Sequence, residues 1–275
     1  MCIRPTSSIR INIVNNCVDS IWPVIVANKE YPNEGFKLEP NESNSFYYDD
    51  EMMELSVFAR TGCDNKFECQ TGSCGHSINC TNYISTPISI ANLKIDHLKD
   101  TYKVDLNHGF NKHITIEPNG HFLKSNKLKN DCETAGKCLY NIKCPDSLVF
   151  RNYQTNLIGC YTGKLNNKNL MSCSNRNDFF NIKDINNALP CDEDIESYYS
   201  FKGSCPTSYF HSVDGDKESI FHCYGRNKNL RPNYKITFSD GVPDQIETNE
   251  LERPCPLLIN RHFTLDCRFK RGIHN

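Results

Sequence analysis

The chain lacks both a strong net charge and a long apolar segment. Its 31 basic and 33 acidic residues leave a formal net charge of −2, and its isoelectric point is near 6.5. A nucleic-acid-binding protein needs a basic face that displaces counterions, so this balance argues against that class. The longest strongly apolar run, Ile21–Ala27, is seven residues long. It is too short to span a bilayer, and no membrane span is expected.

Sequence patterns of several common enzyme and metal sites are also missing. There is no Gly-x-Ser-x-Gly elbow and no phosphate-binding loop. No two cysteines have the two-residue gap of a zinc ribbon or a redox pair. His108, His113 and His121 lie at gaps of five and eight, which suit neither one strand face nor one helix face. We therefore expect no metal and no cofactor.

The chain does have sixteen cysteines, an even number. Apolar residues make up 38% of the chain, and the mean hydropathy is −0.58, so disulfides would supplement a lean core. This composition predicts a disulfide framework in a secreted or extracellular protein. Met1–Pro5 contains no apolar segment of a signal peptide, so we expect that the signal has been removed.

Short segments of alternating apolar and polar residues dominate much of the chain. They begin near Ile9, Tyr102, Ile114 and Tyr234, and further strands are expected at Ile21–Ala27 and Leu55–Arg60. Turn signals such as Glu117-Pro118-Asn119-Gly120 separate the segments. The spacing predicts an antiparallel β-sandwich.

The section from Cys132 to Cys205 carries seven cysteines and few alternating segments. Two short helices are expected there, one capped by Asp178 with Phe179 and Leu189 on its apolar stripe, and one capped by Asp192 and stopped at Gly203. The predicted domains are a discontinuous sandwich (9–60, 85–131 and 206–240), a stapled ribbon (61–84), a disulfide-rich loop and helix domain (132–205) and a C-terminal extension (241–275).

Seven segments, in order, resemble the thaumatin-like proteins. They are Ile11–Cys17 with Ile21-Trp22, Val57–Cys63, Cys69–Gly75, Gly109-Phe110-Asn111, Cys144-Pro145, Cys205-Pro206 and Asn233–Phe238. Ser73 stands where the family usually has an aspartate. The resemblance covers about Ile9 to Ser239 and implies a mainly β fold: a thaumatin-like antiparallel β-sandwich with a disulfide-rich short-helix domain and a small stapled β-ribbon domain.

The resemblance also implies a disulfide pairing, which spacing alone does not determine. The implied pairs are Cys63–Cys69, Cys74–Cys80, Cys132–Cys223, Cys138–Cys205, Cys144–Cys160 and Cys173–Cys191. One family pair in the helical domain is missing at both ends, with Lys164 near one expected position. Ser239 replaces the usual partner of Cys17. We therefore expect Cys17 and Cys2 to pair with Cys255 and Cys267 in some order.

Many members of this family have a cleft with one arginine and four acidic residues, linked in some to weak β-1,3-glucan hydrolysis. Here Ser56 stands at the arginine position, with Arg60 four residues on. The four acidic positions correspond to Asn92, Lys103, His108 and Asp214. Glycoside hydrolysis needs two carboxyl groups roughly 5–9.5 Å apart, and one of four survives. A shift of one residue in the alignment would bring Asp105 or Asp96 into the cleft.

The leading hypothesis is a secreted binding protein of defence or host–microbe interaction, with β-1,3-glucan or another surface polysaccharide as partner. The alternative is an inhibitor of a microbial or digestive hydrolase, and the third is a weak β-1,3-glucanase that uses Asp214. Arg60, Asn92, Lys103, His108 and Asp214 are the candidate cleft residues. Asn41 and Asn79 begin glycosylation sequons. We expect a monomer with no catalytic residue.

Overall fold

The computed structural model describes residues 8–27, 34–48, 53–80, 83–97, 99–123, 131–166, 169–172, 179–181, 195–210, 219–225 and 231–241. Contacts within the chain group Met1–Val242 into one unit and Pro243–Asn275 into a second. The second unit lies outside the described residues. The finer division into sandwich, ribbon and disulfide-rich domains stays a prediction. No helix among the described residues is long and apolar enough to cross a membrane.

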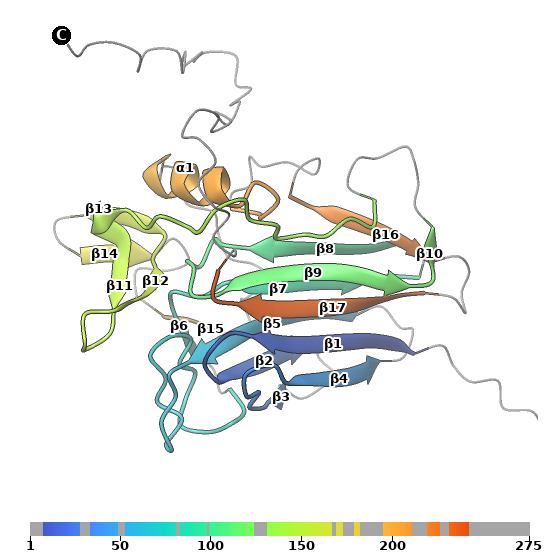
Figure 1. The fold of residues 1–275 in the computed structure, drawn as a ribbon, viewed down its shortest axis with the longest axis horizontal. Coiled ribbons are helices and arrows are strands. Elements are labelled where there is room, and N and C mark those ends of the chain that lie inside the picture. The colour runs from blue at the N-terminus through green and yellow to red at the C-terminus, as the bar shows by residue number, and fades with distance from the viewer. Residues whose placement is uncertain are drawn as a thin grey trace, which may run out of the picture. The chain divides into compact units, whose positions relative to one another are not determined.

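Two β-sheets contain most of the strands of the described chain (Figure 1). The four-stranded sheet has the order β4 (Ser43–Tyr48), β1 (Ile9–Asn16), β17 (Pro232–Ser239) and β9 (His113–Gly120). The seven-stranded sheet has the order β10 (Phe122–Leu123), β16 (Phe221–Gly225), β8 (Lys99–Asp105), β7 (Ile90–Ile95), β5 (Met53–Thr61), β2 (Ile21–Ala27) and β3 (Glu34–Gly35). Neighbouring strands are antiparallel except β1 and β17, which are parallel.

The core lies between these sheets. β17 alternates strictly between buried and half-buried side chains, as a strand with one face on a core should. Buried side chains of both sheets form one cluster, which includes Ile13, Ile236 and Phe238 from one sheet and Leu55, Leu93 and Tyr102 from the other. The predicted strands and the mainly β sandwich are therefore confirmed.

β5 differs because both of its faces are buried. Its second face carries Phe58, which packs in a smaller cluster with Val24, Ile84 and Ile90. Cys74 and Cys80 of the following segment belong to the same cluster. The segment 61–80 therefore covers this face of the seven-stranded sheet and removes it from solvent.

The described residues contain five disulfides, and each joins a pair that the family resemblance implies. They are Cys63–Cys69, Cys74–Cys80, Cys132–Cys223, Cys138–Cys205 and Cys144–Cys160. The first two staple the segment 61–80, and Cys132–Cys223 ties residue 132 to β16 across a separation of 91 residues. In the chain-entropy model a loop of that length is worth about 4.7 kcal/mol. Cys173–Cys191 lies outside the described residues.

The predicted bridge of Cys17 is a point where the structure differs. Cys17 is a free, buried cysteine, with 4% of its surface exposed. Its thiol interacts with Asp240, the residue after Ser239 at the end of β17. The space beside Cys17 is thus occupied by this polar contact. The other three cysteines of that prediction, Cys2, Cys255 and Cys267, lie outside the described residues.

The described part of the section from Cys132 to Cys205 is made of short elements. It contains a 3₁₀ turn (Asp146–Leu148) and the strands β11 (Val149–Arg151), β12 (Leu157–Cys160), β13 (Gly163–Asn166) and β14 (Asn169–Ser172). The helix α1 (Ile195–Ser204) confirms the second predicted helix. The first predicted helix is wrong where it can be followed, because β15 (Phe179–Asn181) pairs with β6 (Tyr83–Ser85). Sheet pairing has overridden the local helical pattern at Phe179.

Candidate functional site

A polar row crosses three strands of the seven-stranded sheet. Ser56 of β5 stands opposite Asn92 of β7, and Asn92 stands opposite Lys103 of β8. Leu55, Leu93 and Tyr102 point into the core, so strand alternation turns the row to the other face. The Ser56 hydroxyl donates a hydrogen bond to Oδ1 of Asn92 at 2.7 Å. The register therefore brings together three of the positions that correspond to the family cleft.

Asp105, two residues after Lys103, supplies the carboxylate of this row. Its Oδ2 lies 2.8 Å from Nζ of Lys103 and 3.5 Å from Nδ2 of Asn92. Its Oδ1 accepts a hydrogen bond from the backbone N–H of Asn107 at 2.9 Å. The Lys103 ammonium also lies 3.6 Å from the ring centroid of Tyr209. Both carboxylate oxygens of Asp105 thus have polar contacts, and the Lys103 ammonium balances the negative charge.

His108 is buried next to this row, with 2% of its surface exposed. Burial lowers the pKa of His108 to about 4, although the negative charge of Asp105 acts in the opposite direction. Lys103 lowers it further. The imidazole is therefore neutral at physiological pH and does not line the cleft as an accessible titrating group.

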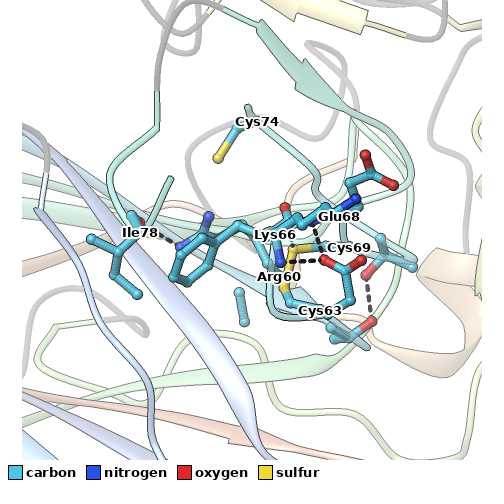
Figure 2. The surroundings of a disulfide bond; sticks show 12 residues. Arg60, Cys63, Lys66, Glu68, Cys69, Cys74 and Ile78 are labelled. Carbon is cyan, nitrogen blue, oxygen red and sulfur yellow. Dashed lines mark hydrogen bonds between the residues drawn. A yellow bond between two sulfur atoms is a disulfide. The ribbon is translucent and has the colours of Figure 1, made fainter. Parts of the chain in front are cut away.

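Arg60 is sealed beneath the stapled segment, in contrast to its expected place in the cleft. It has no exposed surface, and its guanidinium donates to the backbone oxygens of Ser77 at 2.9 Å and Ile78 at 2.5 Å. Figure 2 shows the side chain directed at Ile78, beside the Cys63–Cys69 disulfide. Burial lowers the pKa of Arg60 to about 10. Arg60 holds the segment 61–80 on the seven-stranded sheet and is not accessible to a ligand.

A groove of about 820 Å³ lies elsewhere in the same unit, and none of the residues of the polar row lines it. Its walls come from the β1–β2 turn with Trp22, the residues 61, 62 and 70, the residues 110–113, the residues 141–144, the hairpin β11–β12 and Asp240. Six lining residues carry side-chain amides: Gln70, Asn111, Asn141, Asn152, Gln154 and Asn156. The sequence does not reveal this groove, because its walls come from six segments far apart in the chain.

Charges in the groove are few and mostly compensated. Lys112 pairs with Asp240, whose Oδ2 also accepts the N–H of Val18 at 2.7 Å. Desolvation opposes the ionised form of Asp240, but the contacts with Lys112 and Val18 outweigh it and lower the pKa. Burial lowers the pKa of His113 to about 4, so that imidazole is neutral. Asp19 is the remaining acidic side chain.

One group of possible metal ligands lies beside the groove. Nδ1 of His113 is 3.2 Å from Sγ of Cys138, and Cys205 completes a cluster of three donor residues. Cys138 and Cys205 form a disulfide, and metals bind thiolates. This cluster is therefore not a metal site in the oxidised protein.

Comparison with known proteins identifies the family of the chain. A model of the thaumatin family matches residues 15–240. The chain belongs to the thaumatin family. Pathogenesis-related protein 5 of Arabidopsis thaliana is 30% identical over 237 residues, covering 82% of this chain and 87% of the relative. An osmotin-like protein of Solanum lycopersicum is 29% identical and covers 77% and 82%.

Two further matches have names that refer to carbohydrate-active enzymes. A glucan endo-1,3-beta-glucosidase of Prunus avium is 28% identical, covering 83% of this chain and 89% of the relative. The solved structure of a thaumatin-like xylanase inhibitor is 28% identical and covers 40% of this chain and 76% of that one, with a TM-score of 0.35.

In this thaumatin-family protein, the residues predicted to line the cleft do not all lie together. Asn92 and Lys103 lie together in the polar row, and Asp105 joins them there. Asp96 lies apart, beside Asp100, to which its backbone N–H donates a hydrogen bond. Asp214 lies outside the described residues. Asn41 and Asn79 are exposed, and Oδ1 of Asn79 accepts the N–H of Gly35 at 3.0 Å.

Proposed function

We propose that this thaumatin-family protein is a secreted defence protein that binds β-1,3-glucan or another surface polysaccharide without cleaving it. The observation that carries the proposal is the ion pair of Lys103 and Asp105 in the polar row. Hydrolysis of a glycoside needs one protonated and one ionised carboxyl group. The row offers a single carboxylate among its described residues, and that carboxylate is already paired.

The same row keeps groups that bind sugar hydroxyls. Asn92 and Lys103 are half-buried, and an amide can both donate and accept while an ammonium donates. The row therefore offers hydrogen-bond donors and an acceptor to a sugar. The relative named as a β-1,3-glucosidase supports glucan as the polymer, and the five disulfides support an oxidising, extracellular location.

Retention on insoluble β-1,3-glucan tests this function. The oxidised protein should pellet with the polymer at modest salt, because uncharged sugars are held by hydrogen bonds and stacking rather than by screened charges. The same protein after reduction and unfolding is the control for non-specific adsorption. Equal amounts of folded and unfolded protein in the pellet, or none of either, would contradict the proposal.

Inhibition of a hydrolase is the second candidate, and the hairpin β11–β12 favours it. Tyr153 at its tip is fully exposed, while the Asn152 side chain accepts the backbone N–H groups of Gln154 and Asn156. The Cys144–Cys160 disulfide closes the base of the hairpin. A rigid loop with an exposed aromatic tip loses little entropy when it enters the cleft of another protein.

A panel of xylanase, amylase and protease assays separates this candidate from the first. Inhibition that is lost in Tyr153→Ala would support it, with Tyr47→Ala as the control, because Tyr47 is an exposed tyrosine on β4. No inhibition of any enzyme in the panel would remove it. Glucan binding should not depend on Tyr153, since this residue lies in neither the polar row nor the groove wall.

A further inference from the structure

We infer that the groove of about 820 Å³ is a second ligand site, which takes an uncharged oligosaccharide, separate from the polar row of the family cleft. The inference rests on the proposed function and names where on the molecule a sugar chain would be held. The volume falls within the range of about 300–1,000 Å³ that is typical of sites for small ligands. Four observations carry it, namely charge, amides, aromatic rings and rigidity.

The charge of the groove favours an uncharged ligand. Among the described residues that line it, Asp19, Lys112, His113 and Asp240 can carry a charge. Lys112 and Asp240 neutralise each other, and the buried His113 is uncharged at physiological pH. One exposed carboxylate, Asp19, remains. The groove therefore has no set of charges that would bind an anion or a cation, and a neutral ligand does not need one.

Side-chain amides provide the polar contacts. Gln70, Gln154 and Asn156 are exposed residues that line the groove, and each amide offers two donor hydrogens and an acceptor oxygen. Sugar hydroxyls also donate and accept, so they complement an amide lining in either orientation. Acidic residues would be needed to cleave the sugar, and the groove has no second unpaired carboxylate among its described residues.

Aromatic rings complete the lining. Trp22 and Phe110 both face the groove as half-buried residues. The Lys37 ammonium lies 5.5 Å from the Trp22 ring centroid, and Phe110 contacts the His113 ring edge to face at 4.8 Å. These contacts fix the positions of both rings. A fixed ring offers a flat apolar surface to the C–H face of a pyranose at a low entropic cost.

The walls are rigid before any ligand arrives. Oδ1 of Asn152 accepts the backbone N–H of Gln154 at 3.0 Å and that of Asn156 at 2.9 Å, so both amide-bearing residues stand on an ordered loop. Elsewhere in the lining, the side chain of Gln70 lies against Gly62, where a Cβ atom would approach it to 2.6 Å. Gly62 has a φ of +59°, a conformation that favours glycine. Rigid walls reduce the entropy lost on binding.

The chain contains a single tryptophan, and it lines this groove. Its fluorescence is therefore a probe of changes at the groove. Titration of the intact, oxidised protein with a soluble β-1,3-glucan oligosaccharide, and separately with a chitin oligosaccharide, should change the Trp22 emission for at least one of them. Calorimetry under the same conditions should give the same Kd.

The double variant Gln154→Ala with Asn156→Ala tests the lining. Both side chains are exposed, and the Asn152 bonds to the backbone remain, so the loop should keep its fold. Loss of two neutral hydrogen bonds should weaken binding about tenfold or more. Asn44→Ala removes an exposed amide on β4 outside the groove and should leave the Kd unchanged.

The outcomes separate this inference from the proposed function. The protein could be retained on insoluble glucan while neither oligosaccharide changes the Trp22 emission and the double variant is retained like the wild type. That result would overturn the groove as a ligand site and leave the proposed function intact. A chitin oligosaccharide that binds with the expected Trp22 change, in a protein not retained on glucan, would support the groove and overturn the glucan assignment. No binding to either sugar in any assay would overturn both.

Discussion

Nζ of Lys103 lies 2.8 Å from Oδ2 of Asp105 and 3.6 Å from the centroid of the Tyr209 ring. The ion pair occupies the row where the family's cleft carboxylates are expected. A cation held on one side by a carboxylate and on the other by an aromatic face neutralises the local charge. The free energy of unfolding of the protein should therefore depend on this pair.

The variant Lys103→Ala should lower the free energy of unfolding by about 1–2 kcal/mol, because it leaves the Asp105 carboxylate largely buried without its cation. The Asp105 side chain is 9% exposed. Lys235→Ala is the matched control, since Lys235 and Glu117 form an exposed cross-strand pair that should contribute less than about 1 kcal/mol. Urea unfolding measures both variants, and an equal decrease in their free energies of unfolding would contradict a special role for Lys103.

Arg60→Ala should lower the free energy of unfolding by at least about 2 kcal/mol and make the segment 61–80 accessible to proteases. The variant leaves the backbone oxygens of Ser77 and Ile78 without the donors that they have now and creates a cavity. Arg151→Ala removes an exposed arginine that also donates to a backbone oxygen, that of Thr155. If limited proteolysis cuts the segment 61–80 no faster in the Arg60 variant than in the Arg151 variant, Arg60 does not hold the ribbon.

Stability should fall as the pH drops from about 6.5 to about 4. Burial holds the pKa of both His108 and His113 at about 4 in the folded protein, against about 6.5 in the unfolded chain. Between these values the unfolded chain binds protons that the folded protein does not, so each histidine costs up to about 3 kcal/mol at the acid end. This contribution is absent above about pH 6.5 and stops growing below about pH 4.

Urea unfolding across this range measures the slope. The variants His108→Gln and His113→Gln should each flatten it, whereas His76→Gln should not, because the His76 side chain is 76% exposed. Charges facing the two buried rings, Asp105 and Lys103 at one and Asp240 and Lys112 at the other, are the same in all three variants. If the pH dependence of the free energy of unfolding is unchanged in both His108→Gln and His113→Gln, these two histidines do not cause the loss of stability in acid.

Cys17 should resist alkylation in the folded protein at neutral pH. Burial raises the pKa of its thiol to about 12, and the adjacent Asp240 adds to this rise while Lys112 opposes it. The reactive thiolate is therefore scarce. After unfolding without reductant, peptide mapping should find Cys17 alkylated. A Cys17 that is labelled only after a reductant is added would restore the bridge to the C-terminal extension.

Most of the sandwich could be predicted from the sequence, because its strands follow a period of two. Tyr234, Ile236 and Phe238 alternate with polar residues and are all buried in the core. The pattern at Phe179 suggested a helix, but it pairs as β15 with β6. Local periodicity cannot show a partner strand that lies almost one hundred residues earlier.

The site was harder to predict than the fold. The family resemblance assigns both Asn92 and Lys103 to the cleft, and the strand register places them opposite each other. Arg60 looked like a cleft residue, and its burial depends on the backbone of the ribbon folding over it. Asp105 was recognised only as a shifted alternative, since the sequence does not show which side chain reaches the Lys103 ammonium.

Release of reducing ends from a soluble β-1,3-glucan is the most direct test of binding without cleavage. The protein should bind the polymer and release no more reducing ends than a buffer blank, because the one described carboxylate of the row is paired with Lys103. Release above the blank that disappears in Asp214→Asn or Asp105→Asn would contradict this account, and it would show that a working pair of carboxyl groups is present.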